Sequence, residues 1–573
     1  MTLIHCLSAF LTIVSICCAQ QLHETSALHS FSYRDQEAPQ ESISNSFIST
    51  TVQATSTGTV ENTNTATNTA APSAAAGDTA ADYVIFAKAG ITKEDGDAFG
   101  NTLANMVGEP NMDAIYNELD TPFIWRANLS PDQLDKVKAD SVVSEVQPNE
   151  SATRDTVNPG PASTQASSPS RQKRAEASGV PTADNDIFDL RTLSTPPHMA
   201  TLPDYRFDDS GGKGITVFVI DTGPFVLKHD EFAPPATKAT RRELRLTKNK
   251  KSTLEDTQHG TCVASKVVGK TAGSAVGANL VAIQIEPHGF GLIDGFQAAL
   301  NEIKRKKLKG KAVVTTSILV RPRHVWLKTE TRRLVEGFVE EDVPFITAAG
   351  NFAEQGITEP DTLPAILADE LPIIVVGAAT KDFKMAAASQ RGRLLTTWAV
   401  GEEIKCADPS DLSGLATVSG TSFAAPQVAG IAAYWMAHPD YSKNFVPGKV
   451  STNMRNILGI LSYPRIDGPD YPSIAWNGYD IAETCKGVRG TRRKRRDLSQ
   501  ACSFAPKSAP ASAASSATPS ASAGAASQPM CGTCGDDVSR HYEVVIGGLS
   551  DCTGAEDVKS ACEATEGCEC KFA

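Results

Sequence analysis

Apolar runs alternate with helical patterns between residues 205 and 440. Segments with helical spacing of apolar residues lie at 292–307 and 331–342. Five runs of apolar, often β-branched residues predict buried strands, at 215–220, 280–285, 312–318, 344–350 and 372–379. This order predicts an α/β fold in which a parallel sheet is covered by helices on both faces. Ligands of such sheets bind beyond the carboxyl ends of the strands.

A second, shorter pattern covers residues 82–148. Strands are predicted for DYVIFAK, FIWRANL and VVSEVQP, and helices for EDGDAFGNTLANMV and SPDQLDKVKA. This pattern predicts a small α+β domain, which we call the module. The preceding segment is rich in Thr, Ser, Asn and Ala and holds few apolar residues, so we expect it to be disordered.

The first residues form a short apolar run. Residues 7–19 are apolar and end in small side chains, which is typical of a signal peptide, although no Lys or Arg precedes them. The alternative is a membrane anchor, but a span needs about 20 apolar residues. We therefore predict an exported chain with no stable membrane span.

These patterns divide the chain into consecutive parts. They are a signal peptide (1–19), a disordered segment (20–80), the module (81–150), a linker with a dibasic site (151–174), the α/β domain (175–485), a basic run with a Pro/Ala/Ser linker (486–530) and a Cys-rich tail (531–573).

Charge and cysteine content narrow the classes of function. The formal net charge of -12 argues against a nucleic-acid partner. Of the 13 Cys residues, Cys6, Cys17 and Cys18 lie in the signal peptide. Ten remain, an even number in an exported chain, so we expect disulfides among them. The tail is too short for a large core, so disulfides would stabilise it. A zinc site at Cys531 and Cys534 is the alternative there.

Three short segments hold the residue types of nucleophilic catalysis. VIDTG places Asp221 at the end of a strand, HGTCVAS places His259 at the start of a helix, and SGTSFAAPQVAG places Ser422 where a turn opens a helix. A serine nucleophile needs a base that takes its proton and a carboxylate that orients the base. Each segment alone also fits a structural role, such as a turn or a helix cap. Together, in the order acid, base and nucleophile, they predict a catalytic triad.

A fourth segment, PFITAAGNF, ends a predicted strand at Asn351. Its side-chain amide and the backbone N–H of Ser422 are candidates for the two donors that stabilise an oxyanion. Losing one such donor typically lowers turnover by about 100- to 1000-fold.

These segments together resemble the subtilisin-like serine proteases, or subtilases. The similarity covers roughly residues 200–440, and its most specific part is the motif GTSFAAP at 420–426. Pro426 is unexpected inside a helix, but the nucleophile helix of this family carries a proline there. The resemblance implies that Asp221 orients His259, which acts as general base and then as acid. It also implies that Ser422 attacks the peptide carbonyl while Asn351 helps to hold the oxyanion.

In this family the substrate backbone adds as a strand between two segments of the enzyme. The segments that correspond here are Gly289-Phe290-Gly291 and Ser317-Ile318-Leu319, and Ala348-Ala349-Gly350 precedes the oxyanion residue. Leu319 stands where the family usually has Gly. We expect this residue to narrow the primary specificity pocket. For this reason the family resemblance gives no prediction of which substrates are preferred.

The module resembles the inhibitory propeptide of subtilases, which helps the protease to fold and then blocks its cleft. The phrase PFIWRANLSPDQLDKVKADSVVSEVQPN carries this resemblance, and Asn-x-Ser sequons lie at Asn128 and Asn149. Two sites are candidates for its removal: autocatalytic cleavage near residue 150, and cleavage after Lys173-Arg174 by a dibasic-specific convertase. The alternative at the second site is a solvated charge pair.

A denser basic run at 492–496 precedes the Pro/Ala/Ser linker and ends in Arg495-Arg496. It is a further candidate for processing, with a solvated charge run as the alternative. Cys485 and Cys502 flank the run. If these two residues form a disulfide, cleavage within the run leaves the tail tethered.

Other candidates have structural interpretations. Cys262 is expected to be a buried thiol, with a reactive thiol as the alternative, and His229 is expected to be structural. The basic stretch TRRELRLTKNKK is expected to be a solvated loop, with a role in substrate choice as the alternative. No cluster of His and carboxylates marks a metal site, and no cofactor is required for the chemistry. Structural calcium is common in the family, but no motif places it here.

We therefore predict a secreted, monomeric serine endopeptidase that acts on protein or peptide substrates. Its precursor would be inhibited by its own module. The alternatives are an inactive subtilase scaffold and a cell-surface binding protein that acts through the Cys-rich tail. A proprotein convertase is disfavoured, because such enzymes usually carry Asp-Asp-Gly where this chain has Asp221-Thr222-Gly223.

Overall fold

The computed structural model describes residues 80–149, 187–197, 199, 201–235, 238–247, 252–487, 501–504, 530–531 and 544–545. The predicted signal peptide, nearly all of the 20–80 segment and most of the Cys-rich tail lie outside the described residues. So do the candidate processing residues Lys173, Arg174, Arg495 and Arg496. The hypotheses about these parts remain predictions.

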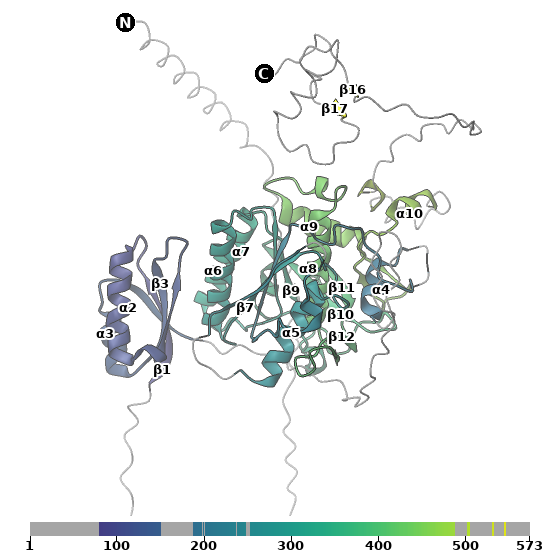
Figure 1. The fold of residues 1–573 in the computed structure, drawn as a ribbon. Coiled ribbons are helices and arrows are strands. Elements are labelled where there is room, and N and C mark those ends of the chain that lie inside the picture. The colour runs from purple at the N-terminus through teal and green to yellow at the C-terminus, as the bar shows by residue number, and fades with distance from the viewer. Residues whose placement is uncertain are drawn as a thin grey trace, which may run out of the picture. The chain divides into compact units, whose positions relative to one another are not determined.

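A nine-stranded sheet forms the centre of the α/β domain (Figure 1). Its order is β14-β15-β11-β10-β9-β8-β5-β7-β6. Neighbours from β15 to β6 are parallel, and β14 is antiparallel to β15. The strands are β5 (Thr216–Asp221), β6 (Arg241–Arg245), β7 (Asn279–Gln284), β8 (Ala312–Thr316), β9 (Phe345–Ala348), β10 (Ile374–Ala379), β11 (Thr397–Val400), β14 (Tyr463–Pro464) and β15 (Ser473–Ile474). All five strands predicted from the sequence are present, close to their predicted bounds.

Helices cover both faces of this sheet, and the predicted fold class is confirmed. On β5, Val217 and Val219 pack in one cluster with residues of α5 and α8, whereas Phe218 and Ile220 pack in another with residues of α6 and α7. This alternation follows from the two-residue period of a strand. The helices are α4 (Phe188–Ser194), α5 (Leu254–Val268), α6 (Gly289–Arg305), α7 (Val325–Glu340), α8 (Thr421–Ala437), α9 (Val450–Leu461) and α10 (Ile481–Gly487).

Short elements complete the domain. Strands β12 (Ile404–Ala407) and β13 (Leu415–Val418) form an antiparallel pair. The 3₁₀ turns are η2 (Asp230–Phe232), η3 (Ala353–Gln355), η4 (Ala365–Asp369), η5 (Ser442–Asn444) and η7 (Cys502–Phe504). In the tail, the described residues form the antiparallel pair β16 (Met530–Cys531) and β17 (Val544–Val545).

The basic stretch was predicted to be a solvated loop, and for residues 241–245 that prediction was wrong, whereas residues 248–251 lie outside the described residues. Its first part is β6, the edge strand that pairs with β7. The guanidinium group of Arg241 donates to the carbonyl oxygens of Val276 and Ala278, at 2.8 and 2.5 Å. Burial lowers the pKa of Arg241 to about 10. An edge strand needs a backbone partner on one side only, and long basic side chains suit such an edge.

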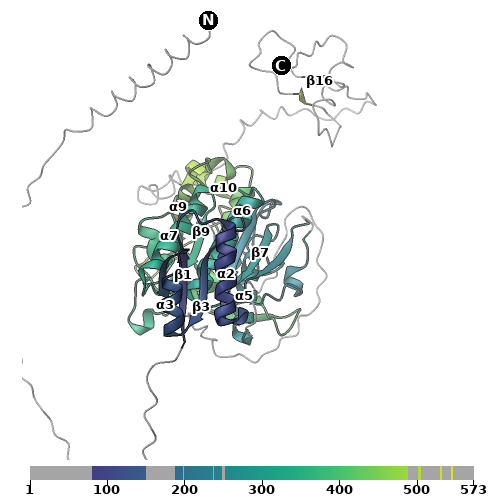
Figure 2. The same ribbon diagram turned by 90° about the vertical axis from the view of Figure 1, so that its left-hand side faces the viewer.

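The module is a four-stranded antiparallel sheet of order β2-β3-β1-β4 (Figure 2). Helices α2 and α3 contribute Phe99, Leu103 and Val137 to a core around Trp125 on one face of the sheet. The sequence pattern missed β2, because this short strand has no alternation of buried and exposed residues. The elements are β1 (Ala81–Ala87), α2 (Lys93–Val107), η1 (Glu109–Asn111), β2 (Met112–Tyr116), β3 (Pro122–Leu129), α3 (Pro131–Lys138) and β4 (Val143–Pro148).

Candidate active site

Asp221 and His259 meet at the carboxyl end of β5. Asp221 is the last residue of this strand and is fully buried. Its Oδ1 lies 2.8 Å from Nδ1 of His259 and accepts the backbone N–H of Thr222, also at 2.8 Å. A carboxylate accepts only, so with Asp221 ionised the ring proton lies on Nδ1 and Nε2 carries the lone pair. This is the tautomer that a general base at Nε2 requires.

Helix α5 carries His259 in its second turn, not at its start as predicted. The helix begins earlier because Thr253 caps it. The hydroxyl of Thr253 accepts the N–H of Asp256, while the Asp256 carboxylate accepts the N–H of Thr253. This capping box fixes the start of the helix, and thereby the turn on which His259 lies.

Ser422 lies in the first turn of α8, as predicted, and its side chain is buried. The ring of His259 lies 5.3 Å from the ring of the next residue, Phe423. The Ser422 hydroxyl oxygen forms no hydrogen bond within the described part of the chain. The structure therefore brings the serine turn next to the His259 helix without closing a bond between Ser422 and His259.

The predicted oxyanion residue Asn351 is bound to the same turn. Its Oδ1 accepts both the backbone N–H and the hydroxyl of Thr421, each at 3.0 Å. The amide nitrogen must then point away from Thr421. A Cβ atom added at Gly420 would lie 3.2 Å from this nitrogen, so glycine leaves space for the amide beside the start of α8.

The segment Ser317-Ile318-Leu319 follows β8, and the segment Ala348-Ala349-Gly350 begins with the last residue of β9. The N–H of Gly350 donates to the Thr421 hydroxyl at 3.2 Å, which places this segment against the serine turn. Leu319 is fully buried in the cluster that also holds Ala348 and Phe423. Both segments thus lie beside α8, where we predicted a substrate-binding edge.

The segment Gly289-Phe290-Gly291 is helical, and its role in substrate binding stays a prediction. It forms the first turn of α6. The side chain of His288 caps this turn by accepting the N–H of Gly291 at 2.8 Å. A Cβ at Gly291 would lie 2.2 Å from the carbonyl oxygen of Glu286, so only glycine fits there. The glycines serve the tight entry into a helix.

Cys262 forms a disulfide with Cys406, so the prediction of a buried free thiol was wrong. The bond joins α5, close to His259, to β12. Its partner lies 144 residues further along the chain, and spacing alone could not identify it among the remaining cysteines. The second disulfide joins Cys485 to Cys502, the pair that flanks the basic run. His229 is buried and bonded through both ring nitrogens, to the N–H of Glu231 and the carbonyl oxygen of Gly414.

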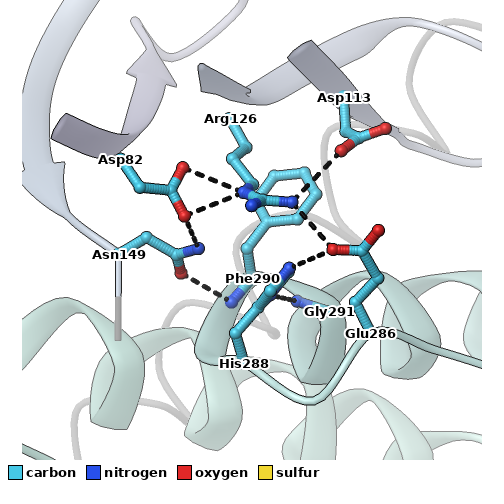
Figure 3. A network of polar contacts seen from close by, with 8 residues as sticks. All are labelled: Asp82, Asp113, Arg126, Asn149, Glu286, His288, Phe290 and Gly291. Carbon is cyan, nitrogen blue, oxygen red and sulfur yellow. Dashed lines mark hydrogen bonds and ion pairs between the residues drawn. The ribbon is translucent and has the colours of Figure 1, made fainter. Parts of the chain in front are cut away.

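The start of α6 is also where residues of the module make contact (Figure 3). Arg126 of β3 donates through Nη1 to Glu286 at 2.9 Å and through Nε to Asp82 at 2.9 Å. It also lies 3.4 Å from Asp113. Burial is the largest single influence on the pKa of Arg126 and would lower it. The hydrogen bond with Asp82 and the charges of Asp82, Glu286 and Asp113 together outweigh burial, so the pKa is raised. One cation thus joins three carboxylates, one of them in the α/β domain.

Asn149 makes a second contact in the same place (Figure 3). Its Oδ1 accepts the N–H of Phe290 at 3.1 Å, and its Nδ2 donates to Asp82 at 2.8 Å. Nearby, the indole N–H of Trp326 in α7 donates to the carbonyl oxygen of Pro148 at 3.2 Å. The end of the module therefore lies at the segment that we predicted to bind substrate.

Apolar side chains complete this contact. Val84, Ile115 and Ile124, on the sheet face opposite the module's own core, belong to one cluster with Phe290 and Trp326. The sequence analysis had not singled out Arg126, Glu286 or Trp326. A signal for this contact was present in the sequence, because the strands of the module are apolar on both faces. The module's own helices cover only one face, so the other face needs a further partner.

The described residues also bear on metal binding and membrane insertion. No group of three or more His, Cys, Asp or Glu residues there is arranged to hold a metal ion. None of the helices in the described part is long and apolar enough to cross a membrane.

Comparison with known proteins identifies the family of this chain. Residues 212–458 match the model of the Subtilase family of S8 peptidases. "Alkaline protease 1" of Aspergillus clavatus is 33% identical over 236 residues, which are 40% of this chain and 54% of the relative. "Subtilisin-like protease 2" of Trichophyton rubrum is 30% identical over 49% of this chain and 63% of the relative. The chain thus spans less than two thirds of the length of these relatives.

A further relative is matched over more of its length. "Subtilisin-like protease 2" of Pseudogymnoascus destructans is 30% identical over 313 residues, which are 54% of this chain and 72% of the relative. The crystal structure of a cold adapted subtilisin-like serine proteinase aligns with 22% identity and a TM-score of 0.40, over 51% of this chain and 98% of that one. On the family model and the sequence relatives, the chain belongs to the subtilase family.

Proposed function

We propose that this chain is a serine endopeptidase in which Asp221, His259 and Ser422 form the catalytic triad. The observation that carries the proposal is the 2.8 Å contact between Asp221 Oδ1 and His259 Nδ1, beside the turn that holds Ser422. The membership in the subtilase family supports it.

The reaction follows from this geometry. Nε2 of His259 takes the proton of the Ser422 hydroxyl as its oxygen attacks the substrate carbonyl carbon, and the C=O π electrons move to the oxygen. The imidazolium is stabilised by Asp221, and it then donates its proton to the leaving amine. Water, activated in the same way by His259, hydrolyses the acyl-enzyme and releases the acid. The Ser422 hydroxyl must bond to His259 before it attacks, and catalytic hydrogen bonds are often loose before substrate binds.

Two donors are suited to the oxyanion of the tetrahedral intermediate. They are Nδ2 of Asn351 and the backbone N–H of Ser422. The Asn351 amide is oriented by Thr421, and the Ser422 N–H lies in the first helical turn, where backbone N–H groups have no helical acceptor. Such fixed dipoles need no reorientation during the reaction, which is why they stabilise developing charge.

The module acts as an intramolecular inhibitor in this proposal. Asn149 bonds to Phe290, and Pro148 to Trp326, so the module ends at the predicted substrate segment. A protein substrate could not reach these groups while the module holds them. Removal of the module, near residue 150 or after Lys173-Arg174 by a dibasic-specific convertase, would free them. Secretion through the predicted signal peptide belongs to the same proposal.

Labelling with a fluorophosphonate probe tests the enzymatic proposal. The processed wild-type protein should be labelled, the Ser422→Ala variant should not, and the exposed-site variant Ser413→Ala should behave as wild type. A processed wild-type protein that stays unlabelled would favour the inactive scaffold instead. Labelling the module-bearing precursor alongside tests inhibition, because the precursor should react more slowly.

We also propose that processing in the basic run leaves the tail attached. The Cys485–Cys502 disulfide spans the run, and Ala501 is packed into the core of the α/β domain. Gel electrophoresis of nicked protein with and without reductant is the test. Release of the tail fragment without reductant would contradict this proposal.

A further inference from the structure

Pro426 interrupts the hydrogen-bond ladder of α8 one turn after the candidate nucleophile. In an α-helix the carbonyl of residue i accepts the N–H of residue i+4. Residue i+4 for Ser422 is Pro426, which has no N–H. The carbonyl of Ser422 therefore lacks its helical donor, although it lies in the interior of the domain. A buried carbonyl without a donor is costly, so a replacement is expected.

The replacement comes from the sheet. The hydroxyl of Ser317 donates to the carbonyl oxygen of Ser422 at 2.8 Å. Ser317 is 2% exposed and follows directly after β8. Its backbone belongs to the predicted substrate segment, but its side chain is bonded to the nucleophile's own peptide group.

The position of β8 makes this bond informative. In the sheet, β8 lies between β5, which ends at Asp221, and β9, which is followed by Asn351. A bond from the end of β8 to Ser422 therefore fixes the nucleophile relative to the same strand ends that hold the other reacting groups.

We propose that Ser317 is a positioning residue for the nucleophile. Its hydroxyl holds the Ser422–Phe423 peptide group, and thereby sets the direction from which the Ser422 hydroxyl meets His259 and the substrate. This inference rests on the proposed triad. The predicted role of the Ser317 segment is to bind substrate through its backbone. Positioning the nucleophile through the Ser317 side chain is a separate role.

Ser274 provides a matched control, because its hydroxyl also bonds to a carbonyl oxygen of α8. The hydroxyl of Ser274 donates to the carbonyl oxygen of Gln427 at 2.8 Å, and Ser274 is equally buried. The helical donor of Gln427 is the N–H of Ile431, so the Ser274 bond is an additional hydrogen bond to this carbonyl. The Ser317 bond, in contrast, replaces a helical hydrogen bond that Pro426 cannot form. Both hydroxyls anchor α8, but only Ser317 acts at the nucleophile.

The test compares wild type, Ser317→Ala, Ser274→Ala and the double variant Ser317→Ala with Pro426→Ala. Each is expressed as the full-length precursor and measured after processing. The readouts are the second-order rate of fluorophosphonate labelling, kcat and KM on a peptide substrate, and the melting temperature. A misplacement of about 1 Å can cost about 100-fold in rate. For Ser317→Ala we expect a 10- to 100-fold slower labelling and a lower kcat, with KM changed by less than about 2-fold.

The other variants separate positioning from stability. Ser274→Ala should lower the melting temperature less than Ser317→Ala, because the Gln427 carbonyl keeps its helical donor, and it should label at nearly the wild-type rate. The double variant regains an N–H at position 426, and its labelling rate should recover in part. If Ser317→Ala does not fold, Ser317→Cys keeps the volume and weakens the donor, and it should show the same slow labelling.

Two results would overturn the inference. One is a wild-type labelling rate for Ser317→Ala or, if that variant does not fold, for Ser317→Cys. The other is an equal slowing in Ser274→Ala. An unlabelled wild-type enzyme would instead refute the triad itself, and the inference with it, so the two failures are distinguishable.

Discussion

Two regions of this protein use carboxylates to hold a cation or an imidazole, and they differ in burial. Along α5, Asp221 contacts His259, and Asp189 of α4 lies 2.5 Å from Nζ of Lys266, two turns further on. The side chains of Asp189 and Lys266 are 2% and 0% exposed. At the start of α6, Arg126 and Glu286 are 13% and 12% exposed, and Arg126 also contacts two further carboxylates, Asp82 and Asp113.

The difference in burial suits different tasks. Separating a fully buried pair leaves a charge without water, so such a contact is effectively permanent. The pair at α6 borders solvent, and under the proposed removal of the module its members would regain hydration. In that proposal, the contacts that last lie inside, and the contacts that break during maturation lie nearer the surface.

The largest effect is expected from Asp221→Asn. The amide keeps the shape of the site and the bond from Thr222, but it offers no charge to the imidazolium and allows the wrong tautomer of His259. The labelling rate and kcat should fall on the order of 10⁴-fold with the fold retained. Asp411→Asn, at an exposed turn, is the control. A loss below about 10-fold would show that Asp221 does not orient the base.

The second largest effect concerns Asp189→Ala. This change leaves the Lys266 ammonium buried without a carboxylate, and the free energy of unfolding should fall by about 3–5 kcal/mol. Urea denaturation in a Ser422→Ala background, which prevents self-digestion, measures it. The double variant Asp189→Leu with Lys266→Met should be close to wild type, since apolar residues often replace a buried ion pair at little cost. A double variant as unstable as the single one would contradict the role of the unpaired charge.

A smaller effect is expected from Arg126→Gln in the precursor. Three carboxylates then remain together without their cation, and the contact between module and α6 should weaken by about 2 kcal/mol. This corresponds to labelling of the precursor that is roughly 30-fold faster, measured before cleavage begins. Labelling at the wild-type rate would mean that the apolar contacts alone hold the module.

The smallest effect should come from Lys93→Gln, in the same module. Lys93 pairs with Asp97 on α2, but the two side chains are 48% and 46% exposed. Such surface pairs typically contribute less than 1 kcal/mol, so precursor labelling should change by less than about 3-fold. This variant is the matched control for Arg126→Gln. A similar increase in precursor labelling for both variants would show that the burial of Arg126 does not explain how strongly the module binds.

The strengths of sequence-based prediction here were local. The strands that end at Asp221 and before Asn351, and the helix that opens at Ser422, follow from apolar runs and turn residues that lie next to each other in the chain. The basic stretch was misjudged because Arg241 reaches carbonyl oxygens far along the chain. The helical turn at Phe290 was not anticipated, because the cap that begins it comes from the side chain of His288.

Contacts between distant residues were beyond the sequence pattern. The partner of Cys262, the ion pair of Lys266 and the docking contacts of Arg126 each join segments that spacing does not relate. The sequence could indicate only part of the bond from Ser317 to Ser422. Pro426 indicates that the Ser422 carbonyl lacks its helical donor, but not which side chain replaces that donor.

The sequence by itself determined the fold class and the candidate reacting groups, because hydrophobic period, turn chemistry and motif order are properties of neighbouring residues. The tertiary structure alone decided which buried groups satisfy one another and where the module lies. Those choices depend on packing, which removes water from some polar groups and leaves it to others, and the cost of an unsatisfied buried group then selects its partner.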